Sequence, residues 1–190
     1  MLYIMRHGKT DWNAKHKLQG HADIPLNEEG KPDFSAPIRM PALKAREEYD
    51  GPVFDVCYCS PLVRAKETAE IFLKGTHTPI IADPRLIEMS FGVYEGIENS
   101  FQIPDCPINE LFDDPEHYEP VKDGESLQEL FARTGEFLEE VIEPLMKEEK
   151  NVLIVGHGAM NASIIGRIRK TPLKDFWNNL GKNCELRRLL

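Results

Sequence analysis

The predicted fold depends most on residues 151–158, which read Asn-Val-Leu-Ile-Val-Gly-His-Gly. A short, uninterrupted apolar run that ends in glycine is typical of a strand buried on both faces of a parallel sheet. A helix is expected to follow directly, from Ala159 to about Ile168. His157 therefore stands between a strand and a helix, with a glycine on either side.

Three more apolar runs predict strands, at residues 2–5, 53–59 and 79–82. The first of them ends abruptly at the polar triplet Arg6-His7-Gly8. Along the chain, these strands alternate with segments of helical pattern, which favours the α/β class. We expect a three-layer α/β/α sandwich with a mainly parallel sheet.

Two short motifs predict where helices begin. Ser60-Pro61 follows the second strand and indicates an N-cap with proline at the first helical position. Ser126 and Glu129 have the spacing of a capping box, and apolar residues at helical spacing follow them as far as Leu145. We therefore expect helices to start at these two points.

Two segments depart from the regular alternation. The region from Glu28 to Arg46 has a helical composition, but three prolines should break or delay a helix there, Pro32, Pro37 and Pro41. Residues 102–123 contain four further prolines and predict a long irregular excursion. We expect residues 89–125 to form a lid inserted into a single domain that covers residues 1–190.

Composition excludes several classes of protein. The chain has 190 residues with 23 Lys and Arg against 32 Asp and Glu, a net charge of −9. A nucleic-acid-binding protein or a polybasic membrane anchor would need a basic surface instead. No apolar run approaches the roughly 20 residues of a membrane helix, and the first residues are too quickly polar for a signal peptide.

Cysteine usage favours a cytoplasmic protein. Cys57 and Cys59 lie two apart in a predicted strand, so their side chains share one face. The four cysteines, which include Cys106 and Cys184, are too sparse for a disulfide scaffold and lack the spacing of a metal site. We interpret them as small apolar core residues.

Unusual polar residues follow three of the predicted strands. Arg6, His7 and Asn13 come after the first, Arg64 lies one turn into the helix after the second, and His157 follows the last. In a parallel sheet, ligands bind outside the carboxyl ends of the strands, near helix N-termini. These cationic and hydrogen-bonding groups would then face one crevice and form a phosphate site.

Each of these residues has a simpler interpretation when taken alone. A histidine after a strand is more often structural, and an arginine at a helix start is more often a surface charge. The combination weakens that reading, because a helix N-terminus repels cations and Arg64 would cost stability there unless an anion offset its charge.

Four ordered motifs carry a resemblance to a known family. They are Arg6-His7-Gly8-x-Thr10-x-x-Asn13, Ser60-Pro61-Leu62-x-Arg64-Ala65, Glu88 ahead of Gly92-x-Tyr94-Glu95-Gly96, and Gly156-His157-Gly158. Together they resemble the histidine phosphatase superfamily, in its phosphoglycerate-mutase-like branch. Tyr94 departs from the tryptophan that is common at its position in the family.

The resemblance implies a role for each matched residue. His7 would be the nucleophile that becomes phosphohistidine, and Glu88 would protonate the leaving oxygen and then activate water. The remaining matched residues would bind the phosphoryl group and the substrate around it: Arg6, Arg64, His157, Asn13, Gly8 and Thr10. The resemblance implies no metal and no cofactor.

Three functions remain open at this stage. We favour hydrolysis of a small phosphorylated metabolite, because residues 89–121 hold eight acids and no Lys or Arg that could bind a phosphoglycerate. An acidic lid would repel polyanions, although these acids could equally face water. The alternatives are a phosphoglycerate-type mutase and a weakly catalytic domain that binds phosphorylated ligands. Oligomeric state is not predicted.

Overall fold

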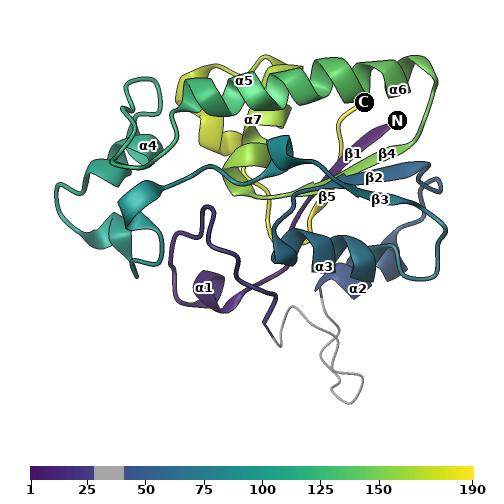
Figure 1. Cartoon of the computed structure of the whole chain (residues 1–190), viewed down its shortest axis with the longest axis horizontal. Coiled ribbons are helices and arrows are strands. Elements are labelled where there is room, and N and C mark those ends of the chain that lie inside the picture. The colour runs from purple at the N-terminus through teal and green to yellow at the C-terminus, as the bar shows by residue number, and fades with distance from the viewer. Residues whose placement is uncertain (28–40) are drawn as a thin grey trace.

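A mixed sheet of five strands forms the centre of the molecule (Figure 1). The computed structural model describes residues 1–27 and 41–190. Its strand order is β3 (Ile80–Ala82), β2 (Val56–Cys59), β4 (Val152–Gly156), β1 (Leu2–Arg6) and β5 (Leu186–Arg188). The first four are parallel and β5 runs antiparallel to β1. The predicted mainly parallel sheet is confirmed, and β5 is the strand that the sequence analysis missed.

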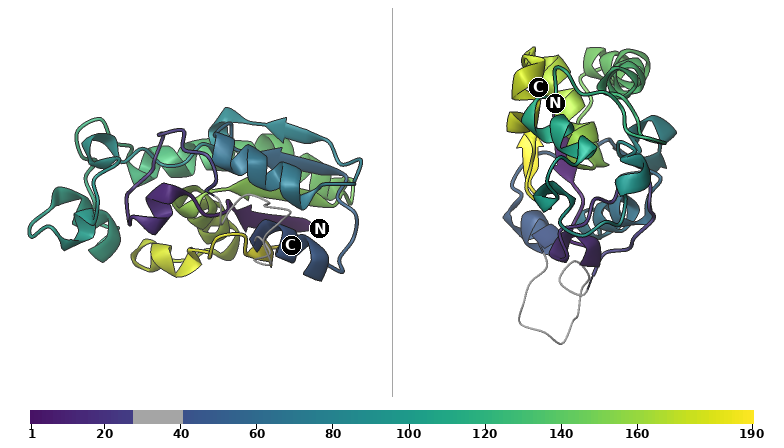
Figure 2. Two further views of the ribbon diagram at one scale, coloured as in Figure 1. Left: turned by 90° about the horizontal axis from the view of Figure 1, so that it is seen from below. Right: turned by 90° about the vertical axis from the view of Figure 1, so that its left-hand side faces the viewer.

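Helices cover both faces of this sheet, which confirms the predicted three layers (Figures 1 and 2). One face carries α2 (Pro41–Glu48) and α3 (Val63–Phe72). The other carries a long helical stretch together with α7 (Gly158–Arg169). That stretch consists of α5 (Leu127–Phe137), the π-helical turn η5 (Leu138–Ile142) and α6 (Glu143–Lys147).

The core divides into two clusters because successive side chains of a strand point to opposite faces. In β4, Val152 and Ile154 pack against the side of α5 and α7, whereas Leu153 and Val155 pack against the side of α3. All five residues of β4 are buried, as the apolar run predicted. All four cysteines are buried and free, and Cys57 and Cys59 share the cluster on the α3 side.

One of the two predicted helix starts is confirmed. Ser126 Oγ accepts a hydrogen bond from the Glu129 amide at 3.1 Å, and Glu129 Oε2 accepts one from the Ser126 amide at 2.9 Å. The predicted N-cap at Ser60 is wrong. Helix α3 begins at Val63, whose amide instead donates to the Asp23 carboxylate at 2.7 Å.

The two irregular segments differ in what the structure describes. Residues 28–40 lie outside the described residues, so the expectation for their prolines is untested, and α2 begins at Pro41. Residues 89–125 project from one end of the sheet (Figure 1). They form short helical turns, namely η2 (Gly92–Tyr94), η3 (Ser100–Gln102), η4 (Pro107–Asn109) and α4 (Glu110–Asp113). Their role as a lid stays a prediction.

Three short helical elements complete the fold: α1 (Asp11–Ala14), η1 (Pro84–Leu86) and η6 (Leu173–Asn179). Within the described ranges, each helix is too short or too polar to cross a membrane.

Candidate active site

Strand pairing brings the predicted residues together at the carboxyl edge of the sheet. Arg6 at the end of β1 lies opposite Gly156 at the end of β4, and the His7 amide donates to the Gly156 carbonyl at 2.8 Å. His7 and His157 therefore leave neighbouring parallel strands at the same level, and their ring centroids are 5.1 Å apart.

The hydrogen bond of His7 fixes which ring nitrogen can react. Nδ1 lies 2.6 Å from the carbonyl oxygen of Gly8, and a carbonyl can only accept, so Nδ1 carries the proton. In the neutral ring, Nε2 then holds a free lone pair. Burial holds the pKa of His7 well below its ordinary value of 6.5, and the charges of Arg64 and Arg6 lower it further. His7 is therefore a neutral imidazole at pH 7, with a lone pair on Nε2.

His157 has the complementary tautomer. Its Nδ1 accepts a hydrogen bond from Arg64 Nε at 3.2 Å, so Nε2 carries the proton. Burial, together with the Arg64 charge, keeps the pKa of His157 well below 6.5. His157 Nε2 is buried without a hydrogen-bond partner in the described structure. A buried donor of this kind costs stability unless a ligand accepts from it.

Arg64 is fully buried, with 0 % exposure, and the backbone holds its guanidinium in place. Nη1 donates to the Ala22 carbonyl at 2.7 Å and Nη2 to the Gly20 carbonyl at 2.8 Å. Burial lowers the pKa of Arg64 to about 10, so it stays charged at pH 7. The sequence suggested a bound anion to offset this charge. The protein supplies three carboxylates that favour the charged form, those of Glu88, Asp23 and Glu95.

Glu95 fixes the loop that holds Arg64. Its Oε1 accepts from the His21 amide at 3.0 Å, and its Oε2 accepts from the Ala22 amide at 3.2 Å. Gly20 adopts a φ of +52°, and a side chain there would overlap the Glu95 carboxylate. The Gly92-x-Tyr94-Glu95-Gly96 motif thus acts on the site through residues 20–22, a role that the sequence analysis did not assign.

The Glu88 carboxylate lies at the N-terminus of α7. Its Oε2 accepts from the amides of Gly158 at 2.8 Å and Ala159 at 3.3 Å. Its Oε1 accepts from the amides of Met160 and Met89, both at 2.9 Å. A helix N-terminus favours a negative charge at this position, so Glu88 occupies an anion site beside the histidines.

Arg133 and His21, which the sequence analysis did not single out, hold the backbone of Glu88. The main-chain carbonyl of Glu88 accepts hydrogen bonds from Arg133 Nη2 at 3.2 Å and from His21 Nε2 at 2.9 Å. Arg133 also forms an ion pair with Glu125, with Nε and Oε1 2.6 Å apart. Arg133 lies in α5, far from the motifs, and nothing in its sequence context signals this contact.

Arg6 and Asn13 retain unused donors. Arg6 Nη1 donates to the Gly181 carbonyl at 2.9 Å, whereas its buried Nε lacks a partner within the described structure. Asn13 Oδ1 accepts from the Thr10 amide at 3.1 Å, which leaves the Nδ2 group of Asn13 available. Both side chains line the same cavity as His7.

Gly8 and Thr10, which the resemblance placed among the substrate-binding residues, are not part of the lining of this cavity. The Gly8 amide donates to Thr68 Oγ1 at 2.9 Å. Thr10 is fully buried, and its hydroxyl caps α1 and contacts Gln19 Oε1 at 3.0 Å. The structure therefore gives these two residues positioning contacts.

A cavity of about 200 Å³ opens beside His7. The motif residues Arg6, Asn13, Arg64 and Glu88 belong to its lining, and we call them its inner part. The lining also contains residues that the motifs did not reveal, which we call its outer wall: Lys17, Phe91, Phe112, Trp177 and Leu180. The eight acids of residues 89–121 are described residues, and none belongs to this lining. These acids therefore do not form the wall of the cavity, although Glu95 acts on the site through residues 20–22. The expectation of an acidic lid that repels polyanions stays a prediction.

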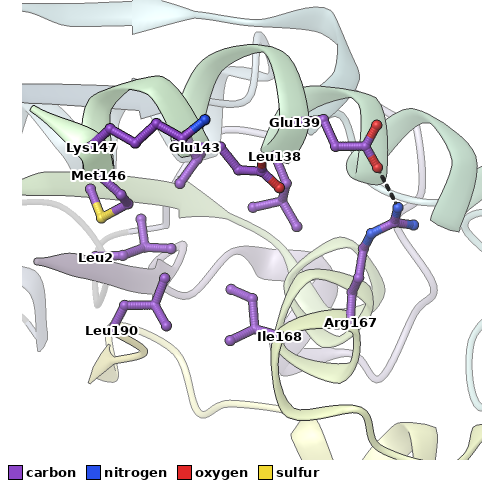
Figure 3. Close-up of a pocket in the computed structure, with 10 residues that line it drawn as sticks. Leu2, Leu138, Glu139, Glu143, Met146, Lys147, Arg167, Ile168 and Leu190 are labelled. Carbon is purple, nitrogen blue, oxygen red and sulfur yellow. Dashed lines mark hydrogen bonds and ion pairs between the residues drawn. The ribbon is translucent and has the colours of Figure 1, made fainter.

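A larger cavity of about 500 Å³ lies near the chain termini (Figure 3). Its floor is apolar and includes Leu2, Met146, Ile168 and Leu190. The ion pair between Arg167 and Glu139, at 2.6 Å, lies at its rim. Its described lining contains no histidine, cysteine or serine, and its charged residues are Glu139, Glu143, Lys147 and Arg167.

The site at the carboxyl edge has the properties of a phosphoryl-transfer centre. His7 carries an unprotonated imidazole nitrogen and lines the same cavity as Arg6 and Arg64, whose donors can hold phosphate oxygens. His157 does not belong to this lining, but its ring centroid lies 5.1 Å from that of His7. Within the described ranges, no group of three or more His, Cys, Asp or Glu side chains is placed to bind a metal ion.

Comparison with known families agrees with this class of site. The family model of the histidine phosphatase superfamily (branch 1) matches residues 2–190, and the chain belongs to this family. It is a phosphatase that acts on small phosphorylated compounds.

Individual relatives span phosphatases and mutases. The chain is 34 % identical over 168 residues to the uncharacterized phosphatase PhoE of Bacillus subtilis, covering 87 % of this chain and 75 % of the relative. It is 30 % identical to a 2,3-bisphosphoglycerate-dependent phosphoglycerate mutase of Cytophaga hutchinsonii, covering 93 % and 80 %. The structure is similar to the alpha-ribazole phosphatase of Shigella flexneri, with a TM-score of 0.77, 28 % identity and coverage of 97 % and 87 %.

Proposed function

We propose that the chain hydrolyses a small phosphomonoester in two steps, through a phosphohistidine at His7. The proposal depends on one observation: the two buried imidazole rings carry their protons on different nitrogens. His7 Nδ1 is committed to the Gly8 carbonyl, which leaves Nε2 as a lone pair. His157 Nδ1 is committed to Arg64, which leaves Nε2–H as an unpartnered donor. One ring can attack phosphorus while the other holds a phosphate oxygen.

In the first step, the His7 Nε2 lone pair forms a bond to phosphorus and the bond from phosphorus to the ester oxygen breaks. Arg6, Arg64 and His157 donate hydrogen bonds to the phosphoryl oxygens and offset their charge in the transition state. Asn13 Nδ2 donates to the same oxygens. The alcohol leaves with a proton, and the phosphoryl group remains on His7.

Glu88 supplies that proton in our proposal. Its carboxyl group accepts hydrogen bonds from backbone amides in the present structure, so one oxygen must leave an amide and face the ester oxygen to deliver a proton. In the second step, the resulting carboxylate takes a proton from water. That water attacks phosphorus, the bond to His7 Nε2 breaks, and inorganic phosphate is released.

Water, rather than a second phosphorylated acid, is the proposed acceptor. Residues 89–121 hold no Lys or Arg that could bind the second acidic group of a phosphoglycerate. The acidic net charge also supports a site for a metabolite rather than a nucleic acid or membrane partner, and we propose that the enzyme works in the cytoplasm.

Release of inorganic phosphate tests this function. The enzyme is assayed with a set of phosphomonoesters in the presence of a chelator, and then with 3-phosphoglycerate and a bisphosphate primer. The proposal expects phosphate release in the first assay and no isomerisation in the second. Isomerisation that exceeds phosphate release would instead establish the mutase alternative.

A further inference from the structure

The outer wall of the cavity identifies a class of substrate. Building on the hydrolysis proposed above, we propose that the alcohol part of the substrate carries a small, planar, apolar ring that packs against Phe112 and Trp177. These two residues come from α4 and η6, and both line the cavity beside His7.

The two rings form a fixed aromatic surface. Phe112 stacks on Trp177 with a centroid distance of 4.9 Å and an interplanar angle of 25°. Trp177 Nε1 donates to the Leu111 carbonyl at 2.6 Å, and Phe176 packs edge-on against Trp177 at 4.9 Å. Both Phe112 and Trp177 are half-buried. A preorganised ring surface in a cavity wall favours another aromatic ring.

This aromatic surface adjoins the phosphate-binding groups through Leu180. A Cβ atom built on Gly158 would lie 3.2 Å from Leu180 Cδ1, 3.5 Å from Glu88 Oε2 and 3.7 Å from Arg6 Cζ. Leu180 also lines the cavity. The proposed proton donor and Leu180 therefore lie on the same side of the cavity, next to Gly158. In our proposal, the carbon substituent of an alcohol oxygen at Glu88 packs against this apolar wall.

Lys17 is the charged residue of this outer wall, and its ammonium group lies 5.9 Å from the centroid of the Trp12 ring, in cation–π range. A substrate with a second acidic group could pair with this ammonium, whereas an uncharged ring would depend on Phe112 and Trp177 alone. Comparison of acidic and uncharged esters therefore distinguishes the two kinds of contact.

A comparison of two esters tests the proposal. Benzyl phosphate and ethyl phosphate are both esters of primary alcohols, so a difference in kcat/KM reports mainly on contacts with the ring. We expect benzyl phosphate to be preferred about fivefold or more over ethyl phosphate, and also over phosphoserine and 3-phosphoglycerate. The Phe112→Leu variant keeps apolar volume but removes a ring, and should reduce that preference to about twofold or less.

Phe131→Leu is the matched control. Phe131 packs edge-on against Phe176 at 5.8 Å and lies outside the cavity lining, so its loss should leave the preference unchanged. A wild-type preference for phosphoserine or 3-phosphoglycerate would overturn the inference, as would an unchanged preference in Phe112→Leu. Failure of every ester to release phosphate would instead refute the proposed hydrolysis, so the two failures are distinguishable.

Discussion

The two ends of strand β1 lead to two very different cavities. At its amino end, Leu2 lines the larger cavity of about 500 Å³. At its carboxyl end, roughly 16 Å away by strand geometry, His7 lines the smaller one of about 200 Å³. The larger cavity has charged residues at an exposed rim, where the side chains of Arg167 and Glu139 are 44 % and 59 % exposed. The smaller cavity has fully buried charge, since Arg64 is 0 % exposed.

Cavity size therefore does not identify the active site in this molecule. Parallel strands place helix N-termini and their free amides at the carboxyl edge of the sheet. A buried donor without a partner at that edge, such as His157 Nε2–H, costs stability unless a ligand accepts from it. The apolar cavity at the other end carries no such cost, and nothing in its lining requires a ligand.

Replacement of His7 is expected to have the largest effect. His7→Ala removes the nucleophile, and we expect kcat to fall by about a millionfold, the loss seen when a covalent nucleophile is deleted. The control is His77→Ala, because His77 is exposed. Steady-state assays of phosphate release check both variants. Substantial turnover by His7→Ala would show that the carboxyl end of β1 does not supply the nucleophile, and would contradict the proposed difference between the two cavities.

The loss of kcat in the Glu88→Gln variant should depend on the leaving group of the substrate. An amide cannot deliver the proton, so alkyl phosphates should be slowed about 100-fold or more. An activated aryl phosphate needs little protonation and should be slowed far less. Parallel measurement of kcat with both substrates is the check. Equal slowing of both would remove Glu88 from the role of proton donor.

Substitution of Glu95 tests whether the loop at residues 20–22 positions Arg64. Glu95→Gln places an NH₂ group against backbone amides, so the loop should shift and Arg64 should lose its fixed orientation. We expect kcat/KM to fall by up to about 100-fold, and inorganic phosphate to inhibit more weakly. The control is Glu98→Gln, because Glu98 is exposed in the same segment. If only thermal stability falls and phosphate inhibition is unchanged, Glu95 has a purely structural role.

The pH dependence of kcat/KM should distinguish the buried His7 and His157 from a histidine with an ordinary pKa. Because the pKa values of His7 and His157 are held well below 6.5, kcat/KM should remain high as the pH falls through 6.5. As the pH falls, the two histidines bind protons at a higher pH in the unfolded chain than in the folded protein. The free energy of unfolding should therefore decrease as the pH drops below about 6.5. A pH–rate profile and urea titrations at pH 7 and pH 5.5 measure these effects. Loss of activity centred at pH 6.5 or above would contradict the prediction.

A substitution in the wall of the larger cavity should have the smallest effect on activity. Ile142 is buried in its wall, and Ile142→Ala should cost roughly 2–5 kcal/mol in the free energy of unfolding. The kcat/KM of the folded enzyme should stay within about twofold of wild type, because no catalytic group touches this cavity. Denaturation and initial-rate measurements check the two expectations. A large loss of kcat/KM would reveal coupling between the two ends of β1.

The sequence was most informative where local patterns are strong. The apolar run before Gly156 predicted the central strand, and the Ser126–Glu129 capping box predicted α5. The predicted cap at Ser60 failed because Asp23, which is distant in sequence, supplies the hydrogen bond to the start of α3. Strand β5 was missed because it is only three residues long and contains two arginines.

The candidate site was predictable only in its inner part. The motifs placed Arg6, His7, Arg64 and His157 near one another, because strand ends converge in a parallel sheet. Glu88 was assigned through the family resemblance alone. The outer wall was not predictable, since Phe112, Lys17 and Trp177 reach the cavity from three separate segments. The supporting contacts of Arg133 and Glu95 depend on tertiary packing, which no local pattern reports.

The most direct measurement is identification of the residue that carries the phosphoryl group during turnover. The wild-type enzyme is mixed with a phosphomonoester, quenched within milliseconds in alkali, digested and analysed by mass spectrometry. The account predicts one phosphoryl group on the peptide that contains His7, on its imidazole ring. Phosphorylation of the His157 peptide instead, or turnover with no labelled peptide, would contradict it.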